Sequence, residues 1–265
     1  MKTILITGST DGVGMLTAIK LAKDGHQLLL HGRNHEKLRN TISEIKEKTR
    51  NDNIMGFVSD LSDFDSIKKM IDELLIKISA IDVLINNAGV YKSAKDCNKD
   101  NLDMRFAVNY FAPFILTNGL LSLLKNSNSS RVINLSSAAQ STVSIEALKG
   151  NKTIMDSEAY AQSKLALTMW SFIFAQLNPE ITTIAVNPGS LLNTNMVKEA
   201  YGHHWSSADK GANILVELAL ADKYSESSGK YFDNDKGSFN TAHSDAYNKK
   251  KINQLIFETE KIINS

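Results

Sequence analysis

Short apolar segments recur along the chain, each bounded by polar or turn-forming residues. Six of them precede residue 188, at 4–7, 27–32, 54–59, 82–86, 131–136 and 182–187. Segments with helical periodicity separate them, for example 14–25 and 66–78. Strands that are apolar without alternation are buried on both faces, and strands that alternate with helices pair in parallel. The pattern therefore predicts a doubly wound α/β sheet with helices on both faces.

The pattern changes after residue 188. A polar loop, 190–211, precedes an apolar helix near 212–221, a seventh short strand at 229–232 and a last helix near 244–263. Ligands of open α/β sheets bind beyond the carboxyl ends of the strands, so we expect the loop to cover a ligand site. No linker or internal repeat interrupts the 265 residues, which predicts one domain over 1–265 with a mostly parallel, seven-stranded sheet.

Composition narrows the classes of function. Thirty basic and 29 acidic residues give a net charge of +1, which does not indicate a nucleic-acid partner. The most apolar long stretch, 107–124, is interrupted by Asn109, Pro113 and Asn118, which favours a buried or subunit-facing helix over a membrane span. Cys97 is the only cysteine, and the first residues run directly into a strand, so we expect a reducing, cytoplasmic location.

The first predicted strand leads into a glycine-rich loop with the sequence TGSTDGVG, residues 7–14. Gly8 permits a tight turn, Gly12 lets the backbone approach a pyrophosphate, and Gly14 allows close packing of the next helix. Because the loop ends a strand and opens a helix, a dinucleotide site is favoured over a plain turn. Its expected cofactor contacts are Gly8, Ser9, Thr10, Asp11, Gly12, Val13 and Gly14.

The end of the second strand, HGRN at 31–34, bears on the choice of cofactor. A carboxylate at this position would accept hydrogen bonds from the ribose hydroxyls of NAD, whereas an arginine can pair with the 2′-phosphate of NADP. No acidic residue is present and Arg33 follows the strand. We therefore predict NADP(H), with NAD(H) as the alternative cofactor and a solvated Arg33 as the alternative interpretation.

Further short motifs follow the later strands in order. They are SDLSD (59–63), NNAG (86–89), VNY (108–110), NLSS (134–137), YAQSK (160–164) and NPG (187–189). With the glycine-rich loop, they resemble the short-chain dehydrogenase/reductase family from residue 3 to about residue 235. The resemblance implies a Rossmann-type fold and further cofactor contacts at Asp60, Leu61, Asn87, Ala88, Gly89, Pro188 and Gly189, together with Tyr160 and Lys164.

The same resemblance implies a catalytic tetrad of Asn109, Ser137, Tyr160 and Lys164, with Ser136 as the alternative serine. Tyr160 would be the acid or base at the substrate oxygen, and Ser137 would hold that oxygen. Lys164, one helical turn away, would lower the pKa of the phenol and bind the cofactor ribose. Asn109 would fix a water that relays protons. The expected activity is hydride transfer between NADP(H) and a small to medium apolar carbonyl or alcohol.

The chain departs from the common family pattern in two places. The segment 138–159 contains an insertion before Tyr160, which is similar to the retinol dehydrogenase-like subgroup. Asn193 stands where the family has threonine, and Thr194 is next. The alternative function is a non-catalytic NADPH-binding redox sensor. By the same resemblance, the helix at 105–124 and the helix near Tyr160 are expected to pair subunits into a homodimer or homotetramer.

The loop 190–211 carries two further candidates. His203 and His204 are adjacent, so they are unsuited to hold one metal ion together, and no third ligand lies nearby in the sequence. We predict no metal and expect both histidines to line or cap the substrate loop. Five apolar residues of the loop could pack it or form a lipophilic wall: Leu191, Leu192, Met196, Tyr201 and Trp205.

Overall fold

The computed structural model describes residues 1–264, except the side chains of Ala200 and Tyr201. Its centre is one sheet in the order β3-β2-β1-β4-β5-β6-β7-β8. The strands are β1 (Thr3–Ile6), β2 (Gln27–Gly32), β3 (Ile54–Val58), β4 (Val83–Asn86), β5 (Arg131–Leu135), β6 (Thr182–Asn187), β7 (Lys230–Asp233) and β8 (Ser238–Asn240). All neighbours pair in parallel except β7 and β8. The predicted Rossmann-type, mostly parallel α/β sheet is confirmed.

The predicted count of seven strands is wrong, because β8 adds an eighth. This strand has three residues and pairs antiparallel with β7 across the tight turn 234–237. Three residues with an exposed first position are too short to produce a hydrophobic pattern, which is why the sequence did not indicate the strand.

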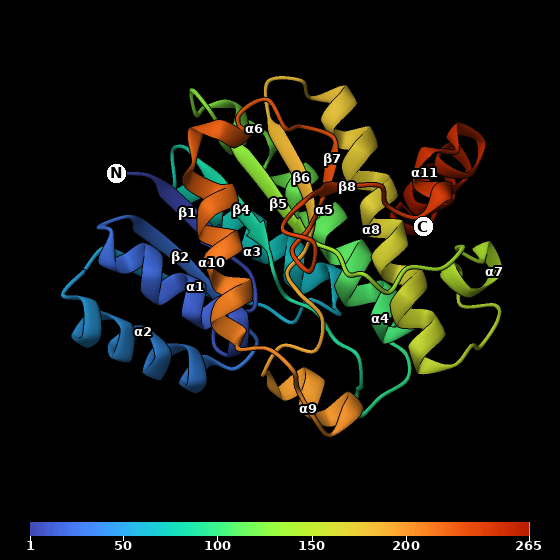
Figure 1. The fold of residues 1–265 in the computed structure, drawn as a ribbon, viewed down its shortest axis with the longest axis horizontal. Coiled ribbons are helices and arrows are strands. Elements are labelled where there is room, and N and C mark those ends of the chain that lie inside the picture. The colour runs from blue at the N-terminus through green and yellow to red at the C-terminus, as the bar shows by residue number, and fades with distance from the viewer. Residues whose placement is uncertain (265) are drawn as a thin grey trace.

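Helices cover both faces of the sheet (Figure 1). In chain order they are α1 (Gly12–Lys23), α2 (His35–Thr49), α3 (Phe64–Lys77), α4 (Met104–Phe106), the π-helix η1 (Ala107–Phe111), α5 (Ala112–Gly119), α6 (Leu121–Lys125), α7 (Ile145–Leu148), α8 (Asp156–Leu177), α9 (Asn195–Tyr201), α10 (Ala208–Leu220), the 3₁₀ turns η2 (Asp222–Tyr224) and η3 (Ser244–Tyr247), and α11 (Lys249–Ile263).

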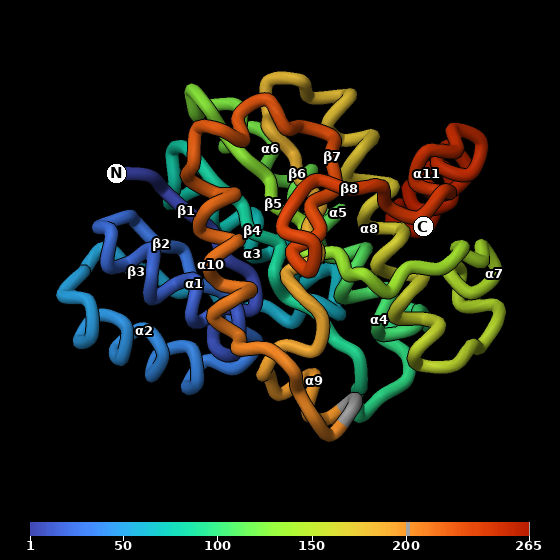
Figure 2. The backbone as a smooth tube through the Cα atoms, in the orientation of Figure 1, coloured from blue at the N-terminus to red at the C-terminus, as the bar shows by residue number. Residues whose placement is uncertain are grey.

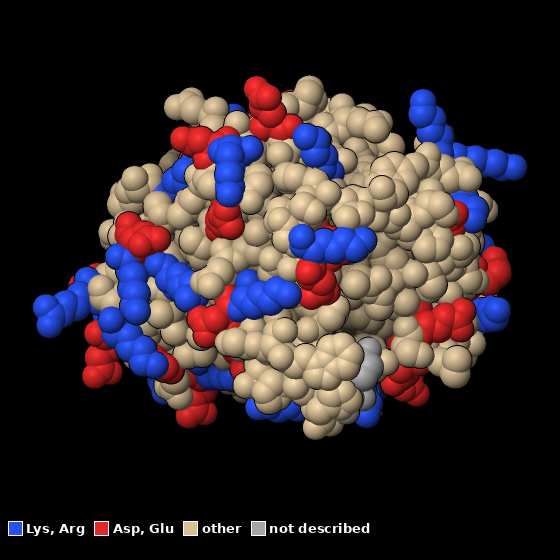
Figure 3. Space-filling model, in the orientation of Figure 1, with Lys and Arg blue, Asp and Glu red and all other residues tan. Residues whose placement is uncertain are grey.

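Two hydrophobic clusters lie on the two faces. Successive residues of a strand point to opposite sides, so Ile4 and Ile6 join the cluster under α1, α2 and α10, while Leu5 joins the one under α3, α5 and α8. The residues of β4 and β5 are all buried, as expected for strands covered on both faces. On the face in Figure 3, basic and acidic side chains lie close to one another.

The apolar stretch 107–124 is divided among η1, α5 and α6 rather than forming one helix. A π-helical turn holds Asn109, Pro113 occupies the first turn of α5, and Leu120 separates α5 from α6. Among the described residues, no helix has the length and apolarity needed to cross a membrane.

The C-terminal helix α11 packs against α8. Its Thr259 and the fully buried Tyr110 of η1 share a hydrogen bond of 2.7 Å between their hydroxyls. Helix α11 therefore covers part of the surface near η1 and α8, where subunit contacts were expected. The homodimer or homotetramer stays a prediction.

Candidate active site

The glycine-rich loop lies between β1 and α1, directly beside the segment that follows β4. Gly8 has φ +63°, and a Cβ on it would lie 2.8 Å from Cα of Ala88. A Cβ on Gly14 would lie 2.4 Å from both Nδ2 of Asn87 and the carbonyl oxygen of Gly8. Side chains at these two positions would force the loop and the segment apart, so the glycines permit the close approach.

Asn87 and Ala88 hold the loop by hydrogen bonds. The amide of Asn87 donates to the carbonyl oxygens of Thr7 (2.8 Å) and Gly8 (3.0 Å). The backbone N–H groups of Asn87 and Ala88 both donate to Oγ1 of Thr7, each at 3.0 Å. The NNAG segment is thus fastened to the glycine-rich loop, which gives a physical reason for this part of the motif.

His31, at the end of β2, binds the glycine-rich loop by hydrogen bonds. This role was not predicted from the sequence. Its Nδ1 accepts a hydrogen bond from the N–H of Gly8 (3.0 Å), so Nε2 carries the proton and donates to the carbonyl oxygen of Ser59 (3.0 Å). The backbone of His31 also bonds the hydroxyl of buried Ser9. Burial lowers the pKa of the imidazole below 6.5, against weaker raising effects of Ser59 and Asp60.

Neutral His31 makes the stability of the fold sensitive to acid. Because the unfolded chain binds a proton below about pH 6.5 and the folded chain resists it, stability present above that pH is lost as the pH falls, at up to about 1.4 kcal/mol per pH unit. We expect His31→Asn to flatten this dependence. Urea unfolding of both proteins from about pH 7.5 to about pH 5.5 measures it. Equal slopes in the two proteins would contradict the assigned protonation state; other histidines, such as His26, contribute equally to both.

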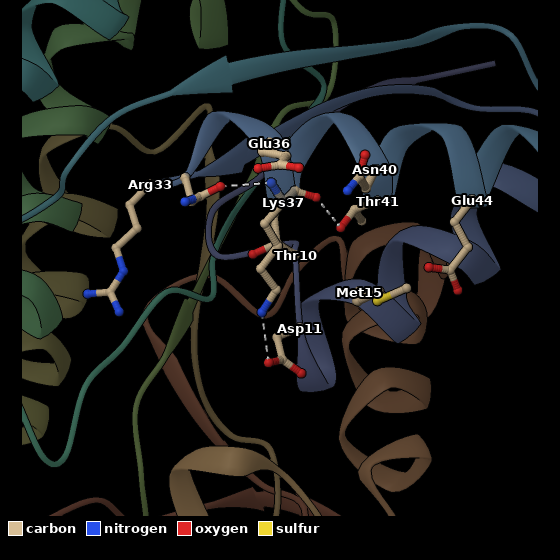
Figure 4. Close-up of a pocket in the computed structure, with 10 residues that line it drawn as sticks. Thr10, Asp11, Met15, Arg33, Glu36, Lys37, Asn40, Thr41 and Glu44 are labelled. Carbon is tan, nitrogen blue, oxygen red and sulfur yellow. Dashed lines mark hydrogen bonds and ion pairs between the residues drawn. The ribbon is translucent and has the colours of Figure 1, made fainter.

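A cavity of about 740 Å³ lies between the glycine-rich loop and the first turns of α2. Figure 4 shows Arg33 projecting on one side of it, while Lys37 crosses toward Asp11. Nζ of Lys37 lies 3.0 Å from Oδ2 of Asp11. Partial burial raises the pKa of Asp11, but the hydrogen bonds from Lys37 and Gly12 outweigh it and lower the pKa below 3.8. Two cations therefore border this cavity, one of them paired with a carboxylate.

Lys37 was not predicted from the sequence. The sequence does place this second basic residue four positions after Arg33, in the first turn of α2, and that spacing could have indicated it.

Other residues expected to contact the cofactor lie nearby. Leu61 is buried, and the carboxylate of Asp60 accepts hydrogen bonds from the backbone (2.9 Å) and hydroxyl (2.7 Å) of Ser62. Thr10 borders the cavity, and Val13 is buried under the loop.

Tyr160 and Lys164 lie one turn apart on α8, at the edge of the sheet where β5 ends. Nζ of Lys164 is 5.6 Å from the centre of the Tyr160 ring and donates a 2.7 Å hydrogen bond to the carbonyl oxygen of Leu135. The Lys164 side chain is buried. The ring of Tyr91, which follows the NNAG segment, lies 5.0 Å from that of Tyr160 between centroids. The structure thus brings the predicted pair to the sheet edge that holds the glycine-rich loop.

Lys164 was expected to lower the pKa of the Tyr160 phenol. In the protein without cofactor, the pKa of Tyr160 is raised instead. Burial raises the pKa of Tyr160 above 10.0, a hydrogen bond with Ser137 opposes this, and nearby Tyr91 adds to it. Burial lowers the pKa of Lys164 from 10.5 to about 7. In the protein alone desolvation favours the neutral form of both groups, so Lys164 is only partly protonated at neutral pH.

The two serines after β5 have different environments. The hydroxyl of buried Ser136 shares a 2.6 Å hydrogen bond with Thr168 and donates to the carbonyl oxygen of Lys164. Ser137 is the serine whose hydroxyl interacts with Tyr160. Its carbonyl oxygen accepts hydrogen bonds from the Tyr231 hydroxyl (3.0 Å) and from Gln140 (2.9 Å). The geometry therefore favours Ser137 over Ser136 beside the reactive phenol.

Asn109 is fully buried in the π-helical turn. Its Oδ1 accepts a hydrogen bond from the N–H of Val90 (2.8 Å), and its Nδ2 donates to the carbonyl oxygen of Val90 (3.0 Å) and to Ser163 (3.0 Å). The side chain thereby fixes the segment after Gly89, whose missing Cβ would lie 3.2 Å from Asn109 and 3.5 Å from Nζ of Lys164. The predicted water relay is not tested by these contacts.

The inserted segment 138–159 is fastened to the C-terminal part of the chain. Oε1 of Gln140 accepts from the N–H of His243 (3.1 Å), and the hydroxyl of Thr142 donates to Asp245 (2.7 Å). Helix α7 lies within the segment. The insertion is therefore held against the C-terminal part of the chain.

The loop 190–211 reaches the glycine-rich loop through its helix α9 (Figure 2). Thr194 caps α9, and its methyl group would lie 3.3 Å from a Cβ on Gly12. Nδ2 of Asn195 donates to Oδ2 of Asp11 (2.8 Å). The displaced threonine of this loop thus still lies against the expected phosphate site, while Pro188 and Gly189 directly follow β6.

The apolar residues of the loop differ in exposure. Leu192 is buried against Gly211, Leu191 and Met196 are partly buried, and Trp205 is 75% exposed. The side chain of Tyr201 lies outside the described residues. His203 and His204 are exposed, and His203 lies 6.1 Å from the ring of Trp205. In the part of the chain that the structure describes, no group of three or more metal-ligating side chains comes together.

A mostly parallel sheet with a glycine-rich loop after β1 and a Tyr–Lys pair beside β5 is typical of dinucleotide-dependent oxidoreductases of the Rossmann type. The family profile for short chain dehydrogenases matches residues 2–204. Polyprenol dehydrogenase of Homo sapiens is 31% identical over 278 residues, covering 96% of this chain and 82% of that protein. Retinol dehydrogenase 12 of Mus musculus is 32% identical over 267 residues, covering 96% and 84%. The chain belongs to the short-chain dehydrogenase/reductase family.

Among solved structures, a short chain dehydrogenase from Escherichia coli CFT073 complexed with NADPH matches with a TM-score of 0.73. It is 26% identical, and the match covers 88% of this chain and 96% of that one. The chain is thus an oxidoreductase of this family in fold and in sequence.

Proposed function

We propose that the protein transfers a hydride between NADP(H) and the carbonyl or alcohol group of an apolar substrate. The observation that carries the proposal is the meeting of Ser137, Tyr160 and Lys164 at the sheet edge that also holds the glycine-rich loop. A phenol, a hydroxyl and an ammonium at one place supply a proton donor, an anchor for the substrate oxygen and a countercharge.

Each residue of this group has a definite task. NADP(H), when bound, supplies or accepts the hydride. Tyr160 donates a proton to the carbonyl oxygen during reduction and removes it during oxidation, while the Ser137 hydroxyl holds that oxygen. The Lys164 ammonium stabilises the phenolate and hydrogen-bonds the cofactor ribose. Asn109 holds the loop that carries Tyr91 against Tyr160.

The cavity beside α2 supports NADP(H) over NAD(H). Arg33 and Lys37 offer two cations to a 2′-phosphate, and residues 31–34 at the end of β2 contain no carboxylate. Three carboxylates also line the cavity, those of Asp11, Glu36 and Glu44, and that of Asp11 is paired with Lys37. The NADPH in the related structure from Escherichia coli adds support.

We expect NADPH to bind at least about tenfold more tightly than NADH, a difference of ~1.4 kcal/mol. Arg33→Ala and Lys37→Ala should each reduce this preference, and the double variant should abolish it without changing NADH affinity. Titration of both cofactors measures the effect. Lys46→Ala is the control, because Lys46 is a partly exposed lysine of the same helix that does not line the cavity. Equal affinities of the wild type for NADPH and NADH would refute the cofactor assignment.

The relatives suggest which substrates to try. Polyprenol and retinol are isoprenoid alcohols with apolar bodies, and the names of two relatives specify action on them. A panel of apolar aldehydes, ketones and alcohols, including retinal and short isoprenoid aldehydes, should be followed through the NADPH absorbance. Turnover by the wild type supports the oxidoreductase. NADPH binding without turnover of any member would favour the redox-sensor alternative.

A further inference from the structure

The tight turn between β7 and β8 lies against both ends of the loop 190–211. Its Asn234 donates through Nδ2 to the carbonyl oxygens of Pro188 (2.9 Å) and Lys210 (3.2 Å). Its backbone N–H donates to the carbonyl oxygen of Asn187 (3.1 Å). The Asn234 side chain thus joins Pro188, just before the loop, to Lys210, near the end of the loop.

Asp235, the next residue of the turn, makes the same connection through its carboxylate. It accepts hydrogen bonds from the backbone N–H (3.0 Å) and hydroxyl (2.5 Å) of Ser190 and from the amide of Asn187 (2.9 Å). It also pairs with Nζ of Lys210 at 3.2 Å. The carboxylate is therefore bound to the first residue of the loop and to a residue one position from its end.

The Asp235 carboxylate is ionised at neutral pH. Partial burial raises its pKa, but the hydrogen bonds from Ser190 and Asn187 and the contact with Lys210 outweigh burial and lower the pKa to about 2. Protonation would weaken the two hydrogen bonds that Ser190 donates to this carboxylate.

The loop held in this way borders two parts of the site. At its start, Gly189 has φ +125°, a conformation available to glycine, and it follows β6 at the edge of the sheet that carries the site. Farther along, Asn195 and Thr194 reach Asp11 and Gly12 of the glycine-rich loop. Fixing both ends shortens the free length of the loop and so restricts where its middle can lie.

We propose that Asp235 is a positioning residue, which together with Asn234 clasps the two ends of the loop 190–211 and holds it against the cofactor. The inference rests on the proposed function and deepens it. It states that the turn between β7 and β8, through the loop, orders the nicotinamide half of NADP(H) and the apolar substrate. Asp235 acts through the loop and touches no reacting atom.

The test compares two ligands in wild type and Asp235→Asn. NADPH contains both halves of the cofactor, whereas adenosine 2′,5′-bisphosphate contains only the adenosine half with its 2′-phosphate. We expect Asp235→Asn to weaken NADPH binding about five- to tenfold and to leave the bisphosphate within about twofold, since the clasp lies away from the adenosine cavity. Hydrogen exchange of residues 190–210 in the ligand-free variant should become faster.

Asp82→Asn is the matched control. The Asp82 carboxylate also accepts a backbone N–H, from Thr3 (2.7 Å), and a hydroxyl, from Ser127 (2.7 Å), but it lies at the opposite end of the strands. This variant should keep both affinities and the exchange rate of residues 190–210 close to those of the wild type.

Four results would each refute one of these assignments. NADPH affinity unchanged in Asp235→Asn, or an equal loss of both ligands, would refute the positioning role. Unchanged exchange of residues 190–210 would refute the clasp itself, whatever the cofactor affinities. A wild type that binds neither ligand would instead refute the proposed function, and the exchange measurement would still decide the clasp.

Discussion

Tyr160→Phe is expected to lower turnover by about 10²-fold or more while NADPH affinity stays within about threefold of the wild type. The substitution deletes only the hydroxyl. The ring can still pack against Tyr91, and Lys164 keeps its bond to the carbonyl oxygen of Leu135. The proton donor is lost but the binding site is not. Steady-state kinetics with any substrate found in the panel, together with NADPH titration, measure the two effects separately.

Tyr224→Phe serves as the control for this result. Tyr224 lies in the hydrophobic cluster of the other face, where its hydroxyl donates to Glu217 (3.2 Å). Loss of that hydroxyl should leave turnover unchanged. If Tyr160→Phe retained near wild-type turnover, Tyr160 would not be the proton donor.

Lys164→Met should have opposite effects on cofactor binding and on stability. It removes the ammonium that binds the cofactor ribose, so we expect NADPH affinity to fall at least about tenfold. The desolvation that lowers the pKa of Lys164 to about 7 costs roughly 4 kcal/mol at neutral pH, whereas leaving the carbonyl oxygen of Leu135 unpaired costs ~1–3 kcal/mol. The ligand-free variant should therefore be more stable than the wild type.

The predicted gain in stability of Lys164→Met can be tested through the pH dependence of unfolding. The folded chain releases the Lys164 proton near pH 7 and the unfolded chain near pH 10.5, so the wild type gains stability as the pH rises between these values. Lys164→Met should lack that gain. Urea unfolding across this range, without cofactor, measures it. A variant that is less stable than the wild type at every pH would show that Lys164 contributes to the fold through its hydrogen bond instead of being strained by burial.

The sequence was a good guide to the sheet because its strands are buried on both faces. Short apolar segments bounded by polar residues, such as 131–136, are typical of buried strands at that length, and β5 is found within one residue of its predicted end. The π-helical turn at Asn109 was not predictable, since one extra residue per turn leaves the apolar character of the stretch unchanged. Strand β8 was too short to be recognised.

The sequence motifs predicted which residues form the site, but not the pKa values or the distant partners of its side chains. The order of the motifs gave the residues that meet at the sheet edge, because parallel strands place their carboxyl ends together. In the protein without cofactor burial raises the pKa of Tyr160, and burial depends on tertiary packing that sequence spacing does not encode. Asp235 acts through a partner distant in sequence, Ser190, so it belonged to no local motif.

Deuterium transfer tests the central claim most directly. The wild type is incubated with an apolar aldehyde and NADPH that carries deuterium at one face of nicotinamide C4, and the alcohol is analysed by mass spectrometry. The account predicts that deuterium reaches the alcohol from one of the two labelled faces only, and that Tyr160→Phe gives a greatly reduced yield. NADPH that binds tightly but passes no deuterium from either face to any member of the substrate panel would contradict it.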